Sequence, residues 1–205
     1  MMAKKALNIM HCENVLDIGC GNGNSADFFK NYSPGIKWVG VDQMRNHRTD
    51  LEFHSFDGQH LPFDDSSFDL LYSNQVLEHV RHPDILMREM ARILRPYGML
   101  VGSTSHLEPY HSYSFWNITP YGFKVIAEDA GFEVTEIRPS IDSLTLILRR
   151  MLGRPRFFNR FWSNESPLNI LINLNKTSHI TNEILNAKKL SYCGQFSFIC
   201  VKSSN

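Results

Sequence analysis

Residues 15–25 read Val-Leu-Asp-Ile-Gly-Cys-Gly-Asn-Gly-Asn-Ser, and this stretch decides the fold. Apolar side chains and the acid Asp17 precede glycines at alternate positions, Gly19, Gly21 and Gly23, and polar residues follow them. This pattern predicts a buried strand that ends in a glycine-rich turn and then opens a helix. Glycines let a ligand approach the backbone closely, and the N-terminus of the following helix attracts anionic groups. We therefore expect this turn to bind a ligand that carries a carboxylate or a phosphate.

The composition of the 205-residue chain is that of one folded domain, because 42% of its residues are hydrophobic. No apolar run reaches the roughly 18 residues that a spanning helix needs, and the apolar run after Lys4 and Lys5 is too short for a signal peptide. The cysteines show neither a C-x-x-C pair nor a metal-ligand spacing: Cys12, Cys20, Cys193 and Cys200. We therefore expect reduced thiols, no metal site and a cytoplasmic location.

The charge of the chain is zero overall but is unevenly distributed. Residues 1–140 contain 12 Lys and Arg against 18 Asp and Glu, a balance of −6, whereas residues 141–205 contain 9 against 3, a balance of +6. The C-terminal part is expected either to meet an anionic partner or surface, or to attract the acidic part of its own chain. Nucleic acid is not expected as the partner, because the chain is neutral and has a single basic cluster.

A strand–helix–strand pattern surrounds the glycine-rich turn. Residues 14–18 are predicted as the first strand, 24–32 as the helix and 36–41 as the second strand, which ends in Asp42. Such a unit with short joints is parallel and right-handed, and ligands bind at the carboxyl ends of its strands. An acid at the position of Asp42 can accept hydrogen bonds from both hydroxyls of a ribose, which favours an adenosine ligand.

Three runs of sequence carry a resemblance to a known family. They are Asp-x-Gly-x-Gly-x-Gly at residues 17–23, LPFDDSSFDL at residues 61–70 and EMARILRPYGMLV at residues 89–101. Together they resemble the class I S-adenosylmethionine-dependent methyltransferases, and the second run resembles the type 11 subset of that class. A dinucleotide fingerprint fits less well, since Asn24 stands where its third glycine belongs.

The resemblance implies a single methyltransferase domain over residues 1–205. Its fold class is α/β, a Rossmann-like doubly wound sheet of seven strands, mostly parallel with an antiparallel last strand, and with helices on both faces. In the family a short connection joins the last two strands, but here residues 140–194 lie between them. We expect this segment to be a helical insert that serves as a lid or an interaction surface.

The resemblance also implies S-adenosylmethionine as the cofactor and places its parts on particular residues. Asp17 would contact the methionine part, Asp42 the ribose hydroxyls, and Asp57, after the third strand, the adenine amino group. The other expected cofactor-binding residues lie in the same turns and strand ends: Gly19, Cys20, Gly21, Gly23, Gln43, Gly58, Ser73 and Asn74.

Methyl transfer from a sulfonium is an in-line displacement, and an oxygen or nitrogen acceptor often also needs a base. Histidine is suited to this role, and the candidates are His79, His106 and His111. His111, in an aromatic loop at residues 105–116, is the first candidate, either for acid–base chemistry or for substrate contact. His79 is the second candidate, although packing or cofactor contact would also explain it. Tyr110 or Tyr113 would orient the acceptor instead.

The predicted function is methyl transfer to an O or N nucleophile of a small molecule, such as a sugar, a lipid-linked intermediate or another metabolite. The alternative is a module that binds S-adenosylmethionine without catalysis and acts as a partner or sensor subunit. Residues 149–162 contain five arginines, four large aromatics and no acid. One expectation is that the segment at residues 140–194 forms a lid or a homodimer contact. The other is that residues 149–162 meet an anionic membrane surface or an anionic substrate.

Overall fold

The computed structural model describes residues 2–43, 48–111, 113–174 and 180–204. The strands are β1 (Asn14–Ile18), β2 (Lys37–Asp42), β3 (Glu52–Ser55), β4 (Phe68–Asn74), β5 (Leu94–Ser105), β6 (Phe132–Pro139) and β7 (Gln195–Lys202). The α-helices are α1 (Met2–Ile9), α2 (Asn24–Tyr32), α3 (Pro83–Ile93), α4 (Pro120–Asp129), α5 (Ser143–Met151), α6 (Pro167–Leu174) and α7 (Asn182–Leu190). Two short 3-10 helices are η1 (Leu77–His79) and η2 (Arg156–Trp162).

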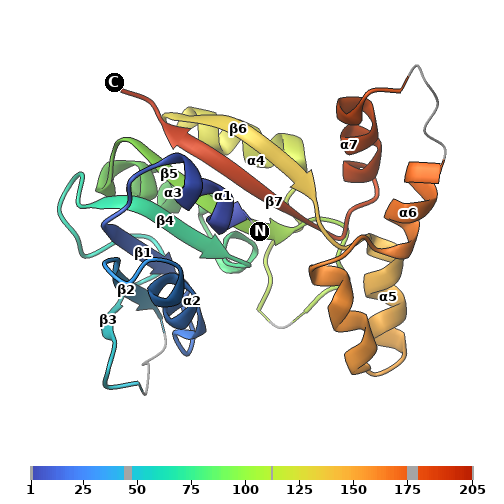
Figure 1. Ribbon diagram of the computed structural model, residues 1–205, viewed down its shortest axis with the longest axis horizontal. Helices are drawn as coiled ribbons and strands as arrows, with labels where there is room; N and C mark the ends of the chain where they lie inside the picture. The colour runs from blue at the N-terminus through green and yellow to red at the C-terminus, as the bar shows by residue number, and fades with distance from the viewer. Residues whose placement is uncertain (1, 44–47, 112, 175–179, 205) are drawn as a thin grey trace.

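The strands form one seven-stranded sheet in the order β3-β2-β1-β4-β5-β7-β6 (Figure 1). Strands β1 to β5 pair in parallel, and β7 runs antiparallel to both of its neighbours, β5 and β6. The predicted fold class, a Rossmann-like doubly wound sheet with an antiparallel last strand, is therefore confirmed.

Both faces of the sheet are buried, because adjacent residues of the central strands point into different cores. In β1, Val15 belongs to the core under α1 and α2, whereas Leu16 belongs to the core under α3 and α4. In β4, Leu70 belongs to the core under α1 and α2, and Leu71 belongs to the core under α3 and α4. This explains why the central strands read as continuous apolar runs in the sequence.

The carboxyl ends of β1, β2 and β4 lie together at one edge of the sheet. Ile18, the last residue of β1, pairs with Val41 of β2 on one side and with Ser73 of β4 on the other. The turn after β1 therefore lies between the ends of its two neighbours, which is where ligands bind in parallel sheets.

Strand β5 has an irregular beginning. It starts at Leu94, directly after α3, and includes Arg95-Pro96-Tyr97-Gly98, a run of residues typical of a turn. The pairing with β4 shifts register between Phe68 and Leu70, and Tyr97 has a φ of 61°. The chain thus makes its turn as an irregularity inside the strand.

The chain between β6 and β7 is mostly helical and lies beyond the end of the sheet (Figure 1). Helix α5 and η2 share a small core of their own, formed by Ile141, Leu146, Phe158 and Phe161. In the described ranges, no helix has the length and apolar character needed to cross a membrane.

Candidate active site

The turn after β1 needs glycine at its first position. Gly19 has a φ of +69°, and a Cβ atom there would lie 2.5 Å from Cγ2 of Val76. Its N–H donates to the carbonyl oxygen of Val41 at 2.8 Å, which fixes the turn to the end of β2. A larger residue would therefore meet both backbone strain and a side-chain clash.

The carboxylate of Asp42 faces this turn from the end of β2. The N–H of Gly21 donates to Oδ2 of Asp42 at 2.8 Å. Farther along the same edge, Gly58 has a φ of +88°, and a Cβ atom there would lie 2.4 Å from Nε2 of Gln43. Glycine at position 58 therefore lets the chain pass close to the Gln43 side chain.

Two cavities lie at this edge of the sheet, and Gly19 lines both. The larger cavity has a volume of about 860 Å³. It is lined by most of the residues expected near the adenosine part of a cofactor: Asp42, Gln43, Asp57 and Gly58. The smaller has a volume of about 290 Å³, and Asp17, Cys20 and Asn74 line it. The two cavities have the arrangement that an adenosine joined to an amino acid requires.

Asp17 is the buried acid of the smaller cavity. Burial raises the pKa of its carboxyl to about 7, and a hydrogen bond from Ser25 Oγ to Oδ2 opposes this rise. Ser25 is held in turn by Trp38, whose Nε1 donates to Ser25 Oγ at 3.0 Å. The charge of Asp17 is therefore available to a cationic ligand group only near and above neutral pH.

Asp57 lines the larger cavity, but its carboxylate is already engaged locally. Oδ1 accepts hydrogen bonds from the N–H groups of Gln59 and His60, both at 2.7 Å, and Oδ2 lies 3.0 Å from Nδ1 of His60. The His60 contact, with the two N–H groups, lowers the pKa of Asp57. Asp57 thus shapes the turn, and its predicted contact with an adenine amino group stays a prediction.

Some predicted residues are placed away from the cavity walls. Ser73 is buried, its Oγ has no hydrogen-bond partner among the described residues, and it lines neither cavity. Gly21 and Gly23 are also absent from the two walls, although both have positive φ values that shape the turn. His106 lines neither cavity, and burial lowers its pKa.

Two histidines come together beside the larger cavity. His79, at the end of η1, lines the cavity, and its Nε2 lies 3.2 Å from Nε2 of His111. One of these nitrogens must carry a proton and the other must accept it. Two tyrosines of the same loop line the cavity and are largely exposed, Tyr110 at 79% and Tyr113 at 86%.

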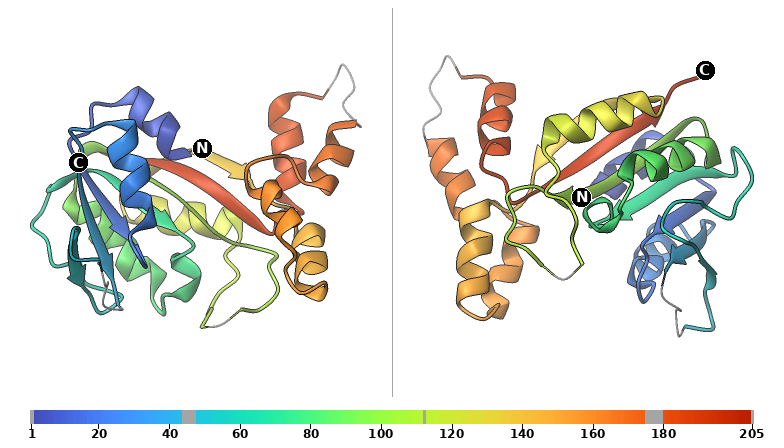
Figure 2. Two further views of the ribbon diagram at one scale, coloured as in Figure 1. Left: turned by 60° about the horizontal axis from the view of Figure 1, so that its bottom comes forward. Right: turned by 180° about the vertical axis from the view of Figure 1, so that it is seen from behind.

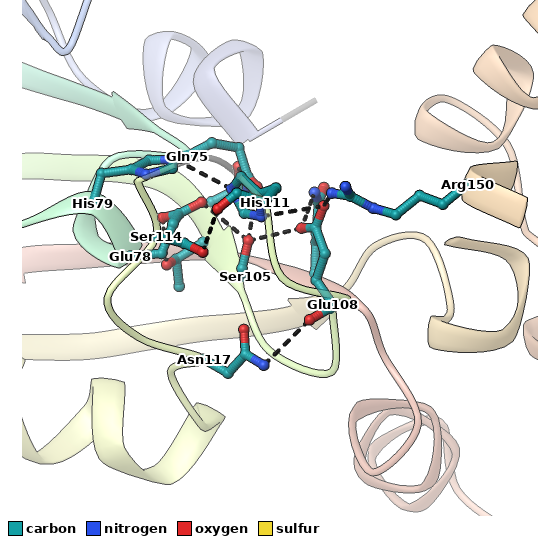
Figure 3. Close-up of polar contacts among 12 residues, drawn as sticks. Gln75, Glu78, His79, Ser105, Glu108, His111, Ser114, Asn117 and Arg150 are labelled. Atoms are coloured by element: carbon teal, nitrogen blue, oxygen red, sulfur yellow. Dashed lines mark hydrogen bonds and ion pairs between the residues drawn. The ribbon is translucent and has the colours of Figure 1, made fainter. Parts of the chain in front are cut away.

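Glu108 connects this histidine pair to the helical segment (Figure 3). Its Oε1 accepts a hydrogen bond from Nη2 of Arg150 at 2.6 Å and lies 3.8 Å from Nδ1 of His111. Its Oε2 accepts from Ser105 Oγ at 2.8 Å and from Gln195 Nε2 at 2.7 Å. Burial alone would raise the pKa of Glu108, but these hydrogen bonds outweigh it and the net pKa is lowered.

A carboxylate beside Nδ1 of His111 favours the tautomer with a proton on that nitrogen. Nε2 of His111 is then the acceptor, and Nε2–H of His79 is the donor between the two rings. This arrangement gives the pair one proton that can move, with the ionised Glu108 close to the ring that would receive it.

Glu78 lies next to this pair and is fully buried. Its oxygens accept hydrogen bonds from Thr104 Oγ1 at 2.9 Å and from Ser105 Oγ at 3.1 Å, and burial raises its pKa. Ligand atoms of Glu78, His79 and His111 lie within 4.8 Å of one another, a donor set that suits a divalent cation. The sequence predicted no metal site.

The sequence did not single out Glu78, Glu108, Arg150 or Gln195 as site residues. Glu108 was visible as the only acid in the loop at residues 105–116, but its partners lie 42 and 87 positions later in the chain. The sequence likewise gave no role to Arg81, which lines the larger cavity and stacks its guanidinium 5.3 Å from the ring centre of Phe115.

The sheet order, the reversed β7 and the cavities above the first glycine turn define a class I S-adenosylmethionine-dependent methyltransferase fold. Residues 16–102, about two fifths of the chain, match the type 11 family model, which is described as a methyltransferase domain. The cofactor of that class is S-adenosylmethionine.

Known proteins of this kind are similar to the chain. Methyltransferase GfsG of Streptomyces halstedii is 34% identical over 106 residues, which cover 46% of this chain and 38% of that protein. The ubiquinone/menaquinone biosynthesis C-methyltransferase UbiE of Bordetella avium is 29% identical over 175 residues, covering 74% and 68%. The chain spans about two fifths of the length of several curated relatives that it matches.

A solved structure agrees with the fold along the whole chain. The S-adenosylmethionine-dependent methyltransferase from Mesorhizobium loti superposes with a TM-score of 0.60 at 16% identity, covering 97% of this chain and 96% of that one. At this identity the likeness bears on the fold alone.

Proposed function

We propose that the chain transfers a methyl group from S-adenosylmethionine to an O or N nucleophile of a small molecule. The observation that carries this proposal is the contact between His79, on the wall of the larger cavity, and His111 behind it. Bound S-adenosylmethionine supplies an electrophilic methyl group. The residues expected to hold it are Asp17 in the smaller cavity and Asp42 in the larger one.

The histidine pair acts as the base in this proposal. Transfer of the methyl group to the acceptor atom, with the sulfur of S-adenosylmethionine as the leaving group, would release the acceptor's proton, and His79 would accept it. The proton on Nε2 of His79 then moves to Nε2 of His111, 3.2 Å away. The Glu108 carboxylate stabilises the cation that results, since it lies 3.8 Å from Nδ1 of His111. Tyr110 and Tyr113 line the mouth of the cavity and orient the acceptor.

The acceptor itself is a sugar, a lipid-linked intermediate or another metabolite in this proposal. One of the relatives named above is a C-methyltransferase of ubiquinone and menaquinone biosynthesis, so the similarity does not by itself select an O or N nucleophile. We also propose that residues 140–194 form an interaction segment within a single domain. Its partner would be an anionic surface or substrate at residues 149–162, or a second copy of the chain.

A calorimetric titration followed by an acceptor screen tests the proposal. We expect S-adenosylmethionine to bind and NAD not to bind, because Asn24 replaces the third glycine of a dinucleotide turn. The screen offers sugars, lipid-linked sugars and other metabolites, with and without EDTA, and is scored by the S-adenosylhomocysteine formed. Loss of turnover in EDTA would mean that Glu78, His79 and His111 bind a metal ion that turnover needs, and that they do not act by proton transfer. Binding without turnover on any acceptor would favour the alternative, a non-catalytic partner or sensor subunit.

The pKa of Asp17 predicts a pH dependence of cofactor binding. The methionine part of the cofactor carries an ammonium group, which favours an ionised Asp17, and burial raises the pKa of Asp17 to about 7 in the free protein. Cofactor affinity should therefore rise with pH and level off above 7, and below 7 it should fall about tenfold per pH unit. Titration calorimetry across this range measures it, and an affinity that does not change with pH contradicts it.

The stability of the free protein should change in the opposite direction. The folded pKa of Asp17 lies above the unfolded value of about 3.9. Protonated Asp17 therefore contributes stability that is fully present below the unfolded pKa and is lost as pH rises through about 7. The matched control is Asp17→Asn, which should bind the cofactor weakly and without this pH dependence.

A further inference from the structure

We propose that the exposed side of α5, together with the arginines that follow it, docks on an anionic lipid surface. The α5 face consists of Leu144, Ile147, Leu148 and Met151, which are 52%, 41%, 43% and 77% exposed. This inference deepens the proposed function, because it names the partner that presents the acceptor, but the docking can be measured without methyl transfer.

The spacing of the α5 face is that of one side of a helix. Its members stand at positions i, i+3, i+4 and i+7, whereas Thr145 and Leu146 point inward and are buried. The helix is also fixed in place from the inside, since Leu146 packs in a small core with Phe158 and Phe161. The apolar stripe is therefore a stable outward surface and not an unfolded end.

The arginines beside the α5 face divide into two groups. Arg150 points inward to Glu108, and Arg149 stacks 4.9 Å from the ring centre of Trp162. Arg154, Arg156 and Arg160 are exposed, and no ion pair found among the described residues includes them. With no acid at residues 149–162, the stretch that directly follows the α5 face in the chain carries positive charge that no neighbouring acid in the sequence compensates. That combination matches the headgroup and acyl boundary of an anionic bilayer.

Helix α5 also lies next to the loop that lines part of the larger cavity. The loop that carries Tyr110 and Tyr113 runs beside α5 in both views of Figure 2, and the Arg150–Glu108 contact joins the two. Both tyrosines are exposed and line the cavity. Tyrosine has an apolar ring and a polar end, which suits the boundary between lipid and water. A bilayer on the α5 face would therefore place an amphiphilic acceptor at the cavity mouth.

Vesicle co-sedimentation tests this inference. The probes are vesicles of phosphatidylcholine alone and of phosphatidylcholine with phosphatidylglycerol, at low and at high salt. Three arginines near the surface should make binding to the anionic vesicles about a hundredfold stronger, and high salt should remove this difference. A Leu148→Ser/Met151→Ser variant should lose about tenfold in partitioning. An Arg154→Gln/Arg156→Gln variant should lose most of the preference for phosphatidylglycerol.

The matched control is Tyr97→Ser/Tyr121→Ser, which removes two exposed aromatics, 68% and 77% exposed, from β5 and α4. It should bind vesicles like the unaltered chain, and all variants should keep their S-adenosylmethionine affinity as a check on folding. Failure to bind anionic vesicles, or equal binding to both kinds, overturns the inference and leaves the methyl-transfer proposal intact. Light scattering provides a second test. If the unaltered chain is a dimer and the Leu148→Ser/Met151→Ser variant is a monomer, the inference is overturned too, because the α5 face would then join two copies of the chain.

Discussion

A His111→Ala variant is expected to turn over about 10²- to 10⁴-fold more slowly than the unaltered chain, the usual contribution of a positioned base. Without the His111 ring, His79 loses the acceptor for its Nε2 proton, since the Nε2 atoms of the two rings lie 3.2 Å apart. His111 is not on the wall of either cavity, so the affinity for S-adenosylmethionine should be unchanged. Initial rates with the acceptor found by the screen, and calorimetry with the cofactor, measure the two quantities separately.

Two histidine variants provide controls for this prediction. His82 is an exposed residue at the start of α3, and His82→Ala should leave the rate unchanged. His106 was a candidate in the sequence, but it lines neither cavity, so His106→Ala should have little effect on the rate. An unchanged rate in His111→Ala would remove the histidine pair from the mechanism and would favour alignment of the acceptor by Tyr110 and Tyr113.

The arrangement of the glycine turn and the neighbouring strand ends was predictable from the sequence because its determinants are local. The positive φ of Gly19 belongs to a turn that the residues next to it in the chain already indicate. The place of Asp42 at a strand end follows from the apolar residues directly before it. The parallel topology then brings these strand ends together without further information. The helices α5, α6 and α7 were predictable for the same reason, since each carries its own apolar spacing.

The contacts of the loop at residues 105–116 were only partly predictable because the residues that make them are distant in sequence. A cluster of arginines indicates positive charge, but it does not say which side chains point inward. The sequence placed Arg150 in the basic stretch at residues 149–162, whereas in the structure this guanidinium points to Glu108. Gln195 illustrates the same limit, since it reaches Glu108 from the start of β7.

The other large effect is expected on stability, in a Glu108→Ala variant. The carboxylate holds together residues of three elements, Arg150 of α5, Gln195 of β7 and Ser105 of β5, at 2.6 to 2.8 Å. Its removal leaves a largely buried guanidinium without its ion pair and the buried Gln195 amide without its acceptor, whereas Ser105 keeps its hydrogen bond to Glu78. Losing one member of such a pair typically costs about 3 to 5 kcal/mol in the free energy of unfolding. Equilibrium unfolding in urea, with the m-value checked for constancy, measures the loss.

Two comparisons distinguish the stability lost with the buried network from the stability lost when any single charge is removed. Glu128 is a glutamate near the surface whose contact with Lys124 is 3.6 Å long, so Glu128→Ala should cost at most about 0.5 kcal/mol. Arg150→Ala should also destabilise the chain, but by less than Glu108→Ala, because the Glu108 carboxylate then keeps its hydrogen bonds from Ser105 and Gln195. The double variant should then cost less than the sum of the two, since the second substitution removes a group that the first left unpaired. Additive losses would mean that Glu108 and Arg150 stabilise the chain independently, and the connection between α5 and the histidine pair would have to be abandoned.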